Sequence, residues 1–495
     1  MIVDSRSDRQ VLPVRAAVAA EAVTMSNRLS RALGRGSGTV VGGRIGLAID
    51  PRLLVTLAEG RRVALVTGTN GKTTTTRMLA TALAASEGLL VVSNHTGANM
   101  PAGHVAAMVG STREVPAVLE VDEGYLGRVM ADTGPRTVVL LNLSRDQLDR
   151  ISEVRMLADR WREALGSPGR TTAGGSPPAV VANADDPMVV YAASAAAGVH
   201  WVGAGQAWRN DAVGCPSCGG RIVFDDTGRK GPDGANGADG ADGAIGADGA
   251  DPADGADGSD PADGAQAGQG GHGGHGGWSC ERCGLSRPRC VAWVDGSVLA
   301  LADGSRYSLD IGLPGQFNRS NAAMAAVAAA LTEGEGAQDG LGWSRGVSRA
   351  VDHIARVREV AGRFSHVSRR GRAVRLLLAK NPAGWTAIFD LLDEGGQTCE
   401  PVVLSVNARI ADGLDTSWLW DVPFERLAGR VALATGDRRL DLAVRLRYAG
   451  VECTVVADPV AAIDRAIDCT QQTAPHAAID FLGNYTAFAD MRSRL

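Results

Sequence analysis

The stretch that decides the fold reads Val63-Ala-Leu-Val-Thr-Gly-Thr-Asn-Gly-Lys-Thr-Thr-Thr-Thr76. Its apolar, β-branched start predicts a strand, and the glycine-rich loop that follows ends in Lys72-Thr73 at the head of a predicted helix. Backbone N–H groups and a helix N-terminus at such a loop attract phosphate oxygens. We therefore predict an ATP site, with Lys72 on the β/γ-phosphates and a threonine hydroxyl on Mg²⁺.

One detail departs from the general phosphate-loop pattern, because Val66 occupies the place of its first glycine. Gly68 and Gly71 give the flexibility in a shorter turn. The alternative is an ordinary strand–turn–helix that carries a surface lysine.

The bulk properties indicate a multidomain protein without a membrane span. A chain of 495 residues corresponds to roughly two to four domains. No apolar run approaches the roughly 20 residues that a membrane-spanning helix needs, and Met1–Gln10 carry charges of both signs and lack the apolar core of a signal peptide. We expect a cytoplasmic protein, with peripheral contact to the inner membrane face as one option.

The charge is concentrated in one segment. The formal net charge is -5, yet residues 231–277 contain nine aspartates and neither lysine nor arginine, which leaves +4 on the remainder. A nearly neutral body without a basic, aromatic stripe argues against a zinc-ribbon ATPase that binds nucleic acid.

The central part of the chain alternates strands and helices. An amphipathic helix over 15–35 and a glycine-rich connector precede it. Packing on the next domain is the expected use of that helix, and its basic character makes a membrane surface the alternative. Alternation of this kind is typical of a parallel, doubly wound sheet. The predicted strands are 62–67, 89–93, 117–121, 137–142 and 179–183, and helices are predicted at 72–86 and 154–165.

Polar residues follow several of these strands, where ligands of such sheets collect. Glu120, Asp122 and Glu123 follow the strand 117–121, and carboxylates suit a hydrated Mg²⁺, although a solvated acidic turn is the alternative. The segments 142–149 and 183–187 offer Asn and Asp at later strand ends, each of which is a weak signal by itself.

Two Cys-x-x-Cys pairs predict a structural zinc site. Cys215, Cys218, Cys280 and Cys283 give the four thiolates of a closed tetrahedral site, with Cys290, His272 and His275 as competing ligands. The long spacer between the pairs is mostly Gly-Ala-Asp repeats, which cannot bury a core and should stay disordered. We predict a zinc ribbon over 213–292 interrupted by an insert at 231–277.

A second α/β unit follows. A Pro-Gly turn delivers Asn318 to the start of an alanine-rich helix, where it caps the helix or faces a nucleotide. Strands are predicted at 374–380, 401–407, 431–435, 452–457 and 477–482, and helices at 384–393, 440–448 and 459–471. The loops 380–384 and 407–421 carry polar and aromatic residues, which favours a docking surface or an active-site loop over a plain connector.

Four of these motifs resemble the central and C-terminal domains of the Mur ligases. They are Thr67-Gly-Thr-Asn-Gly-Lys-Thr73, Glu120-Val-Asp-Glu123, Asn183-Ala-Asp-Asp186 and Leu313-Pro-Gly-Gln-Phe-Asn-Arg-Ser-Asn321. Mur ligases form an acyl-phosphate from ATP and a carboxylate, which an amine then attacks. The zinc ribbon, Arg145-Asp-Gln-Leu-Asp-Arg150, Ala379-Lys-Asn-Pro-Ala-Gly384 and Asp412-Gly-Leu-Asp-Thr-Ser-Trp-Leu-Trp-Asp421 resemble the MurT-type branch, the synthetase subunits of lipid II isoglutaminyl synthases.

The resemblance, which runs from about Ser30 to the C-terminus outside the insert, implies an activity. The α-carboxyl of D-glutamate in lipid II would be activated by ATP and amidated, with ammonia from a separate, GatD-like glutaminase in a heterodimer. The residues support that division of labour, because Cys290, Cys399, Cys453 and Cys469 lack the Gly-flanked context of a glutaminase nucleophile.

The resemblance also implies residue roles. Lys72, Thr73 and Glu120 belong to the phosphates and Mg²⁺, and Asp415 completes the partner's Cys-His pair into a triad, with Asp412 and Asp421 as competitors. The nucleotide contacts are Gly68, Thr69, Asn70, Gly71, Lys72, Thr73, Thr74, Asn318 and Arg363.

The predicted architecture is α/β throughout. An N-terminal helix and connector (1–47) precede a Mur ligase-type ATP-binding domain with the zinc ribbon (48–320), and a Rossmann-like domain (321–495) ends the chain. The alternative function is a Mur-type or folylpolyglutamate-type ligase that joins an amino acid to a carboxylate, and a scaffold with a relic nucleotide site is a further one.

Overall fold

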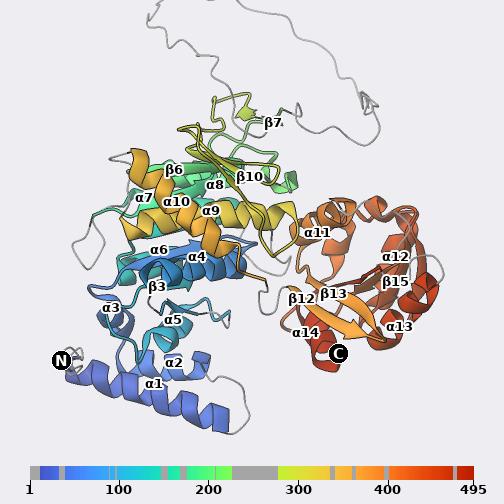
Figure 1. Ribbon diagram of the computed structural model, residues 1–495, viewed down its shortest axis with the longest axis horizontal. Helices are drawn as coiled ribbons and strands as arrows, with labels where there is room; N and C mark the ends of the chain where they lie inside the picture. Colours follow the sequence, from blue (N-terminus) through green and yellow to red (C-terminus); the bar gives the residue numbers. More distant parts are fainter. Residues whose placement is uncertain are drawn as a thin grey trace, which may run out of the picture.

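The computed structural model places two sheet-based domains side by side, with a helical hairpin below the first (Figure 1). The structure describes residues 12–32, 39–88, 90–94, 97–145, 154–167, 176–206, 208–225, 277–334, 340–358, 364–394, 401–471 and 477–495. Most of the predicted Gly/Ala/Asp insert and Arg363 lie outside these residues. In this part of the chain, no helix is both long and apolar enough to cross a membrane.

The central domain is built on a nine-stranded sheet in the order β11-β10-β9-β6-β5-β4-β1-β3-β2. All pairs from β2 to β9 are parallel, and β10 and β11 add an antiparallel edge. The strands are β1 (Val63–Thr67), β2 (Val92–Ser93), β3 (Ala117–Glu120), β4 (Thr137–Leu140), β5 (Ala179–Asn183), β6 (Val199–Gly203), β9 (Ala292–Asp295), β10 (Val298–Leu301) and β11 (Arg306–Ser308).

The chain leaves β1 toward β3 and β2 on one side and later continues to β4 on the other. The carboxyl ends of β1 and β4 therefore diverge at a topological switch point, where open α/β sheets bind ligands. The phosphate loop leaves β1 at this point, so the predicted parallel, doubly wound sheet is confirmed.

Helices cover both faces of this sheet. The face with Val66, Val139 and Val181 packs against α4, α9 and α10, and the opposite face packs against the remaining helices of the domain. The helices are α3 (Leu53–Ala58), α4 (Lys72–Glu87), α5 (Pro101–Met108), α6 (Leu126–Thr133), α7 (Val154–Gly166), α8 (Pro187–Ala193), α9 (Gln316–Glu333) and α10 (Gly340–Ile354), and α1 (Val14–Ala32) with α2 (Thr39–Ile49) forms the hairpin below them.

The expected domain boundary at 320/321 falls inside α9. Because α9 packs on α4, β4 and β5, its alanine-rich surface belongs to the central core, and α10 packs on α9 and α4. The second sheet starts only at Phe364.

The C-terminal domain holds a six-stranded sheet in the order β12-β13-β17-β14-β15-β16. Its first strand was not predicted, because β12 alternates polar residues along an antiparallel edge beside β13. The strands are β12 (Phe364–Arg369), β13 (Arg372–Leu378), β14 (Val402–Ser405), β15 (Val431–Thr435), β16 (Glu452–Val455) and β17 (Ile479–Gly483), and the helices are α11 (Pro382–Glu394), α12 (Arg439–Tyr448), α13 (Pro459–Thr470) and α14 (Tyr485–Arg494).

Candidate functional site

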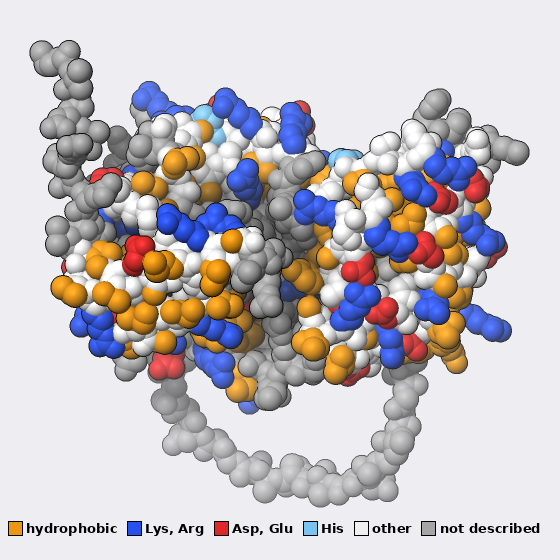
Figure 2. Space-filling model, turned by 90° about the horizontal axis from the view of Figure 1, so that it is seen from below, with side chains coloured by type: hydrophobic (Ala, Val, Ile, Leu, Met, Phe, Trp, Pro, Cys, Tyr) orange, Lys and Arg blue, Asp and Glu red, His pale blue; other side chains and the backbone are white. Residues whose placement is uncertain are grey.

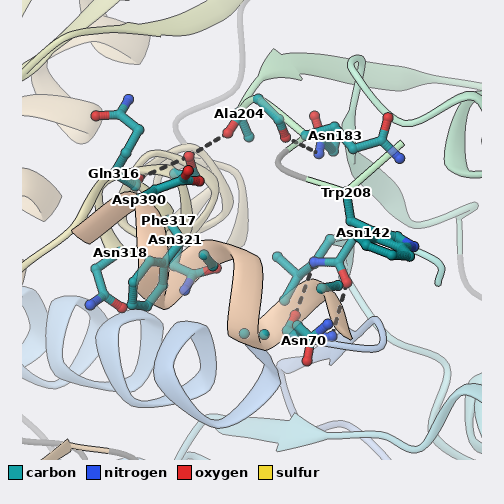
Figure 3. A pocket seen from close by; sticks show the side chains of 18 of the residues that line it. Asn70, Asn142, Asn183, Ala204, Trp208, Gln316, Phe317, Asn318, Asn321 and Asp390 are labelled. Carbon is teal, nitrogen blue, oxygen red and sulfur yellow. Dashed lines mark hydrogen bonds between the residues drawn. The ribbon is translucent and has the colours of Figure 1, made fainter. Parts of the chain in front are cut away.

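The phosphate loop is held open by the loop that follows β4. The backbone N–H of Thr69 donates to the carbonyl of Asn142 over 2.9 Å, and the amide side chain of Asn142 exchanges two hydrogen bonds with the backbone of Asn70, at 2.9 and 3.0 Å (Figure 3). The Thr69 hydroxyl donates to the carbonyl of Ser144 at 3.0 Å and accepts from its N–H at 3.0 Å. These contacts bridge the switch point and shape the loop.

Both the backbone conformation and the close packing at position 71 require a glycine. It precedes α4 with φ 85°, in the left-handed region that favours glycine. A Cβ atom there would lie 2.5 Å from Oδ1 of Asn321 on α9. The absence of a side chain at Gly71 lets Asn321 of α9 come close to the N-terminus of α4, whose N–H groups can attract an anion.

Thr73 and Glu120 meet at the end of β3. The Thr73 hydroxyl donates to Oε2 of Glu120 over 2.8 Å, and Glu120 is buried. A hydroxyl and a carboxylate oxygen at this separation suit a hard cation such as Mg²⁺, which prefers oxygen ligands. The residues present therefore fit the predicted metal.

Two residues that the sequence analysis missed hold Glu120 in place. The Asn94 side chain accepts from the Glu120 N–H and donates to its carbonyl, both at 2.8 Å. Nε2 of His104 on α5 lies 2.8 Å from the same carbonyl, and burial lowers the pKa of His104 to about 4. A neutral imidazole can donate here, and no local sequence signal marks either residue.

Lys72 points back into its own loop. Its Nζ donates to the carbonyl of Gly68 over 2.6 Å and pairs with Oε2 of Glu123 at 3.1 Å, and the side chain is buried. Glu123 is thus the partner of the lysine, whereas Glu120 is the partner of Thr73. The Asp122 side chain accepts a hydrogen bond from the Gly124 N–H in a turn. This is the arrangement expected from the alternative interpretation, in which the acidic residues form a turn.

Asp186 joins the ends of β4 and β5. Its carboxylate caps α8 by accepting from the N–H groups of Met188 and Val189, and it accepts from Leu143 N–H at 2.8 Å. Complete burial raises the pKa of Asp186 to about 6. Asp185 pairs with Arg287 at 2.6 Å, so both aspartates have structural partners.

A cavity of about 480 Å³ lies between the two domains, within the range of small-molecule sites. The phosphate loop and strand ends of the central domain form one wall, and α11 with β13 forms the other. Figure 3 shows polar and aromatic side chains around it, including Asn70, Asn142, Asn183, Trp208, Phe317, Asn318, Asn321 and Asp390.

The cavity brings together part of the predicted nucleotide set. Asn70, Gly71, Thr74 and Asn318 line it, whereas Lys72 and Thr73 adjoin it along the chain. Asn318 is buried and its amide donates to the carbonyl of Pro314 at 2.6 Å. This bond braces the Pro-Gly turn and leaves the side chain on the cavity wall.

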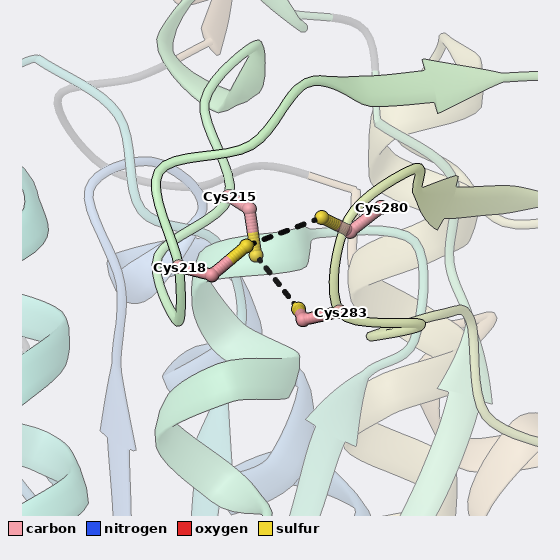
Figure 4. A group of neighbouring side chains, drawn as sticks. All are labelled: Cys215, Cys218, Cys280 and Cys283. Atoms are coloured by element: carbon pink, nitrogen blue, oxygen red, sulfur yellow. Dashed lines mark hydrogen bonds between the residues drawn. The ribbon is translucent and has the colours of Figure 1, made fainter. Parts of the chain in front are cut away.

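The four cysteines converge on one point. The Sγ atoms of Cys215, Cys218, Cys280 and Cys283 all lie within 4.8 Å of one another (Figure 4). Tetrahedral zinc with Zn–S bonds of about 2.3 Å needs Sγ atoms roughly 3.8 Å apart, so the residues fit the ion. Cys290 is not part of this group.

The sequence around each pair shapes a knuckle. The N–H groups of Gly220 and Arg282 donate to Cys218 and Cys280 Sγ, each over 3.4 Å. The pairs are bridged by β7 (Ile222–Phe224) and β8 (Trp278–Cys280), which are antiparallel, and Trp278 donates to Ala184 O at 3.0 Å. The ribbon is thereby attached to the central domain beside the cavity.

We expect Cys215→Ser to remove the metal and to destabilise the ribbon. Zinc content should fall from about one ion per chain to near zero, because three thiolates leave the tetrahedral shell open. Metal analysis of the purified protein and thermal unfolding measure the two effects. Cys290→Ser is the matched control, since Cys290 is also buried but lies outside the cluster. Unchanged zinc content in Cys215→Ser would point to another ligand.

The loop after β14 separates its three aspartates. Asp412 is buried and accepts from the N–H and hydroxyl of Thr486, which ties the loop to α14. Asp421 faces Arg145 of the central domain at 3.5 Å. Asp415 is exposed, and hydrogen bonds from the backbone and hydroxyl of Ser417 hold the pKa of its carboxyl below the usual range.

The loop that carries Asp415 also exposes apolar side chains. Ile410 is 97% exposed and Leu414 is 67% exposed, and Trp420 packs edge-on against the exposed Tyr448 at 5.4 Å. Exposed apolar and aromatic side chains gathered in this way are typical of protein interfaces. The loop on which we expect a docking surface thus has the residue composition of a protein interface.

Two family models match parts of the two domains. Residues 66–213 match the Mur ligase middle domain, and residues 378–488 match the MurT ligase C-terminal domain. The chain belongs to the MurT type of Mur ligase. Among curated proteins, this MurT-type chain is 26% identical to a Staphylococcus aureus (strain COL) protein over 95% of each chain, and 28% identical to one of Streptococcus pneumoniae (strain ATCC BAA-255 / R6) over 94% of each. Both are named lipid II isoglutaminyl synthase (glutamine-hydrolyzing) subunit MurT.

Solved structures show the same fold at lower identity. MurF from Acinetobacter baumannii matches with a TM-score of 0.55 and 14% identity, over 91% of the MurT-type chain and 79% of its own. Folylpolyglutamate synthase from Mycobacterium tuberculosis, complexed with ADP and AMPPCP, matches with a TM-score of 0.54 and 16% identity, over 95% and 98%. The predicted fold class is confirmed by these neighbours.

Proposed function

We propose that this protein is the synthetase subunit of a lipid II isoglutaminyl synthase, which amidates the α-carboxyl of D-glutamate in lipid II at the expense of ATP. The observation that carries the proposal is the match to the MurT subunits over nearly the whole length of both chains. The phosphate loop, with Thr73 beside Glu120, gives the chemistry that such a match requires.

The nucleotide would occupy the interdomain cavity. The N-terminus of α4 and the N–H groups of the loop face the phosphates, and Asn318 and Asn321 offer amides on the wall formed by α9. Arg363, the remaining nucleotide contact of the proposal, lies outside the described residues. Thr73 and Glu120 would hold Mg²⁺, which neutralises phosphate charge when it is bound.

The reaction would proceed in two steps. A carboxylate oxygen of the substrate attacks the γ-phosphorus of ATP and ADP leaves, which forms an acyl-phosphate. Ammonia then attacks the carbonyl carbon, the nitrogen loses a proton, and the C–O bond to the phosphate breaks, so that the phosphate leaves as hydrogen phosphate with that proton. In the first step Lys72 stabilises charge on the transferred phosphoryl group, and this requires the Lys72 ammonium to exchange Glu123 for phosphate oxygens.

The walls of the cavity come from both domains, and this enclosure favours the second step, the attack of ammonia on the acyl-phosphate. Water competes with ammonia for an acyl-phosphate, so a site enclosed from two sides protects the intermediate. The central strand ends contribute one side and α11 contributes the other.

Ammonia would come from a separate, GatD-like glutaminase bound at the surface around Asp415. Asp415 is exposed and its carboxyl stays ionised, which is what orienting a partner imidazole demands. Asp412 is already engaged by Thr486, and Asp421 faces Arg145. The zinc ribbon has a structural role, because its four thiolates close the coordination shell.

The deciding experiment compares nucleophiles with one substrate. The protein is incubated with ATP, Mg²⁺ and lipid II, together with either an ammonium salt or single amino acids, and the products are analysed by mass spectrometry. We expect amidated lipid II with ammonium alone. Product formed only with an amino acid would identify a peptide-bond-forming ligase instead.

A further inference from the structure

The helical hairpin has its apolar side outward. In α2 the glycines face the protein: a Cβ on Gly43 would lie 1.8 Å from the Ala102 carbonyl of α5, and one on Gly46 would lie 2.5 Å from Val23 of α1. Two large apolar residues of the same helix point away, with Val41 60% exposed and Ile45 exposed as well, whereas Leu47 and Ile49 pack against the core. A helix that rests on a soluble domain normally shows the opposite arrangement.

The outer side of α1 has the same character. Val14, Val18, Met25 and Leu29 are all exposed, and their spacing places them within one narrow stripe of the helix. We call these four, together with Val41 and Ile45, the N-terminal apolar face. Figure 2 views the molecule from this side and shows rows of hydrophobic side chains across the lobe that carries α1 and α2.

Basic side chains border this face. Arg15, Arg28, Arg31 and Arg44 are exposed on the two helices, against a single exposed acid, Glu21. Neither helix contains lysine or an aromatic residue. In Figure 2 the lobe shows mainly orange and blue, whereas the C-terminal domain mixes red and blue.

We propose that the N-terminal apolar face docks on the anionic surface of a lipid bilayer. Amphipathic helices that lie in a membrane interface combine aliphatic side chains on one side with flanking arginines, and the arginines attract acidic headgroups. A protein partner is less favoured, because the hot spots of protein interfaces are enriched in tryptophan and tyrosine besides arginine, and both helices lack aromatic residues.

The place of the hairpin gives this surface a use. Gly43 brings α2 against α5, and His104 of α5 lies on the carbonyl of Glu120. The docking face is therefore one helix layer away from the strand end that we assign to Mg²⁺. This use rests on the proposed function, in which the substrate is linked to a lipid. The arrangement would then hold the site of phosphoryl transfer at the bilayer that carries the substrate.

Vesicle flotation of the full chain tests the proposal. We expect binding to vesicles of equal parts phosphatidylcholine and phosphatidylglycerol, and much less binding to phosphatidylcholine alone. Met25→Glu and Ile45→Glu should each lower the partition coefficient about tenfold, because a charged side chain replaces a buried apolar one. Met156→Glu is the matched control, since Met156 is also an exposed methionine on a helix, α7.

Two further readouts make the outcomes distinct. Equal flotation of the wild type, Met25→Glu and Ile45→Glu would overturn the proposal, as would a dimer of the wild type that both variants convert to monomer. Amidation of lipid II in detergent micelles should be unchanged in both variants, while amidation of lipid II in vesicles should fall. If neither the wild type nor any variant amidates lipid II, in micelles or in vesicles, the proposed function is overturned. The flotation result still stands in that case.

Discussion

Lys72→Ala should abolish amidation of lipid II with glutamine and with ammonium alike. The lysine is the one cation of the phosphate loop, and removal of a positioned charge from a site of phosphoryl transfer lowers kcat by about 10²–10³-fold. The measurement is the rate of ADP release and of amidated product, at saturating ATP. An activity within a few-fold of the wild type would place phosphate binding elsewhere.

The same substitution also leaves Glu123 buried without its ion-pair partner, and that alone destabilises a protein by several kcal/mol. The double variant Lys72→Ala/Glu123→Gln separates the two effects. The neutral amide should restore much of the thermal stability, while activity should remain lost. Recovery of activity along with stability would show that Lys72 acts by holding the loop in shape rather than by contacting phosphates.

Asp415→Asn should uncouple the two half-reactions of the complex. An amide cannot stabilise an imidazolium as a carboxylate does, so hydrolysis of glutamine by the bound partner should fall roughly 10³-fold. Amidation with added ammonium should stay near normal, because Asp415 lies on an exposed loop and does not line the interdomain cavity. Both rates are measured on the reconstituted complex.

Asp421→Asn is the matched control for this experiment. It removes a carboxylate from the same loop, but one that faces Arg145 of the central domain. We expect glutaminase activity close to that of the wild type in this variant. Loss of ammonium-dependent amidation in Asp415→Asn would move that residue into the synthetase site, and loss of glutaminase activity only in Asp421→Asn would exchange their roles.

Short-range sequence patterns were sufficient to predict those parts of the protein that depend on residues close together in the chain. The strand–loop–helix of Val63–Thr76 predicted the phosphate loop, and the two Cys-x-x-Cys pairs predicted a cluster that the structure brings together across a long insert. Five strands of the central sheet and five of the second followed from apolar runs. The strands β6, β9, β10 and β11 of the central sheet were not predicted, and neither was the edge strand β12, whose alternating polar residues resemble a loop. The helical period of α1 was predicted too.

Choices between chemically equivalent residues needed the tertiary structure. Glu120, Asp122 and Glu123 look alike along the chain, but the fold places one beside Thr73, one in a turn and one beside Lys72. The partners of Glu120 and Glu123 come from the phosphate loop, some 50 residues earlier, and no local pattern encodes that distance. The supports of Glu120, Asn94 and His104, are invisible in the sequence for the same reason.

The sequence by itself therefore determined the parts that depend on residue types at fixed short spacing: a candidate phosphate loop, a four-cysteine cluster that could hold a metal, and an α/β frame. The tertiary structure alone decided which carboxylate serves which partner, that α9 belongs to the central core, and which side of α1 and α2 faces outward. These depend on packing between segments far apart in the chain, where burial and close contact, as at Gly43 and Gly71, select one arrangement.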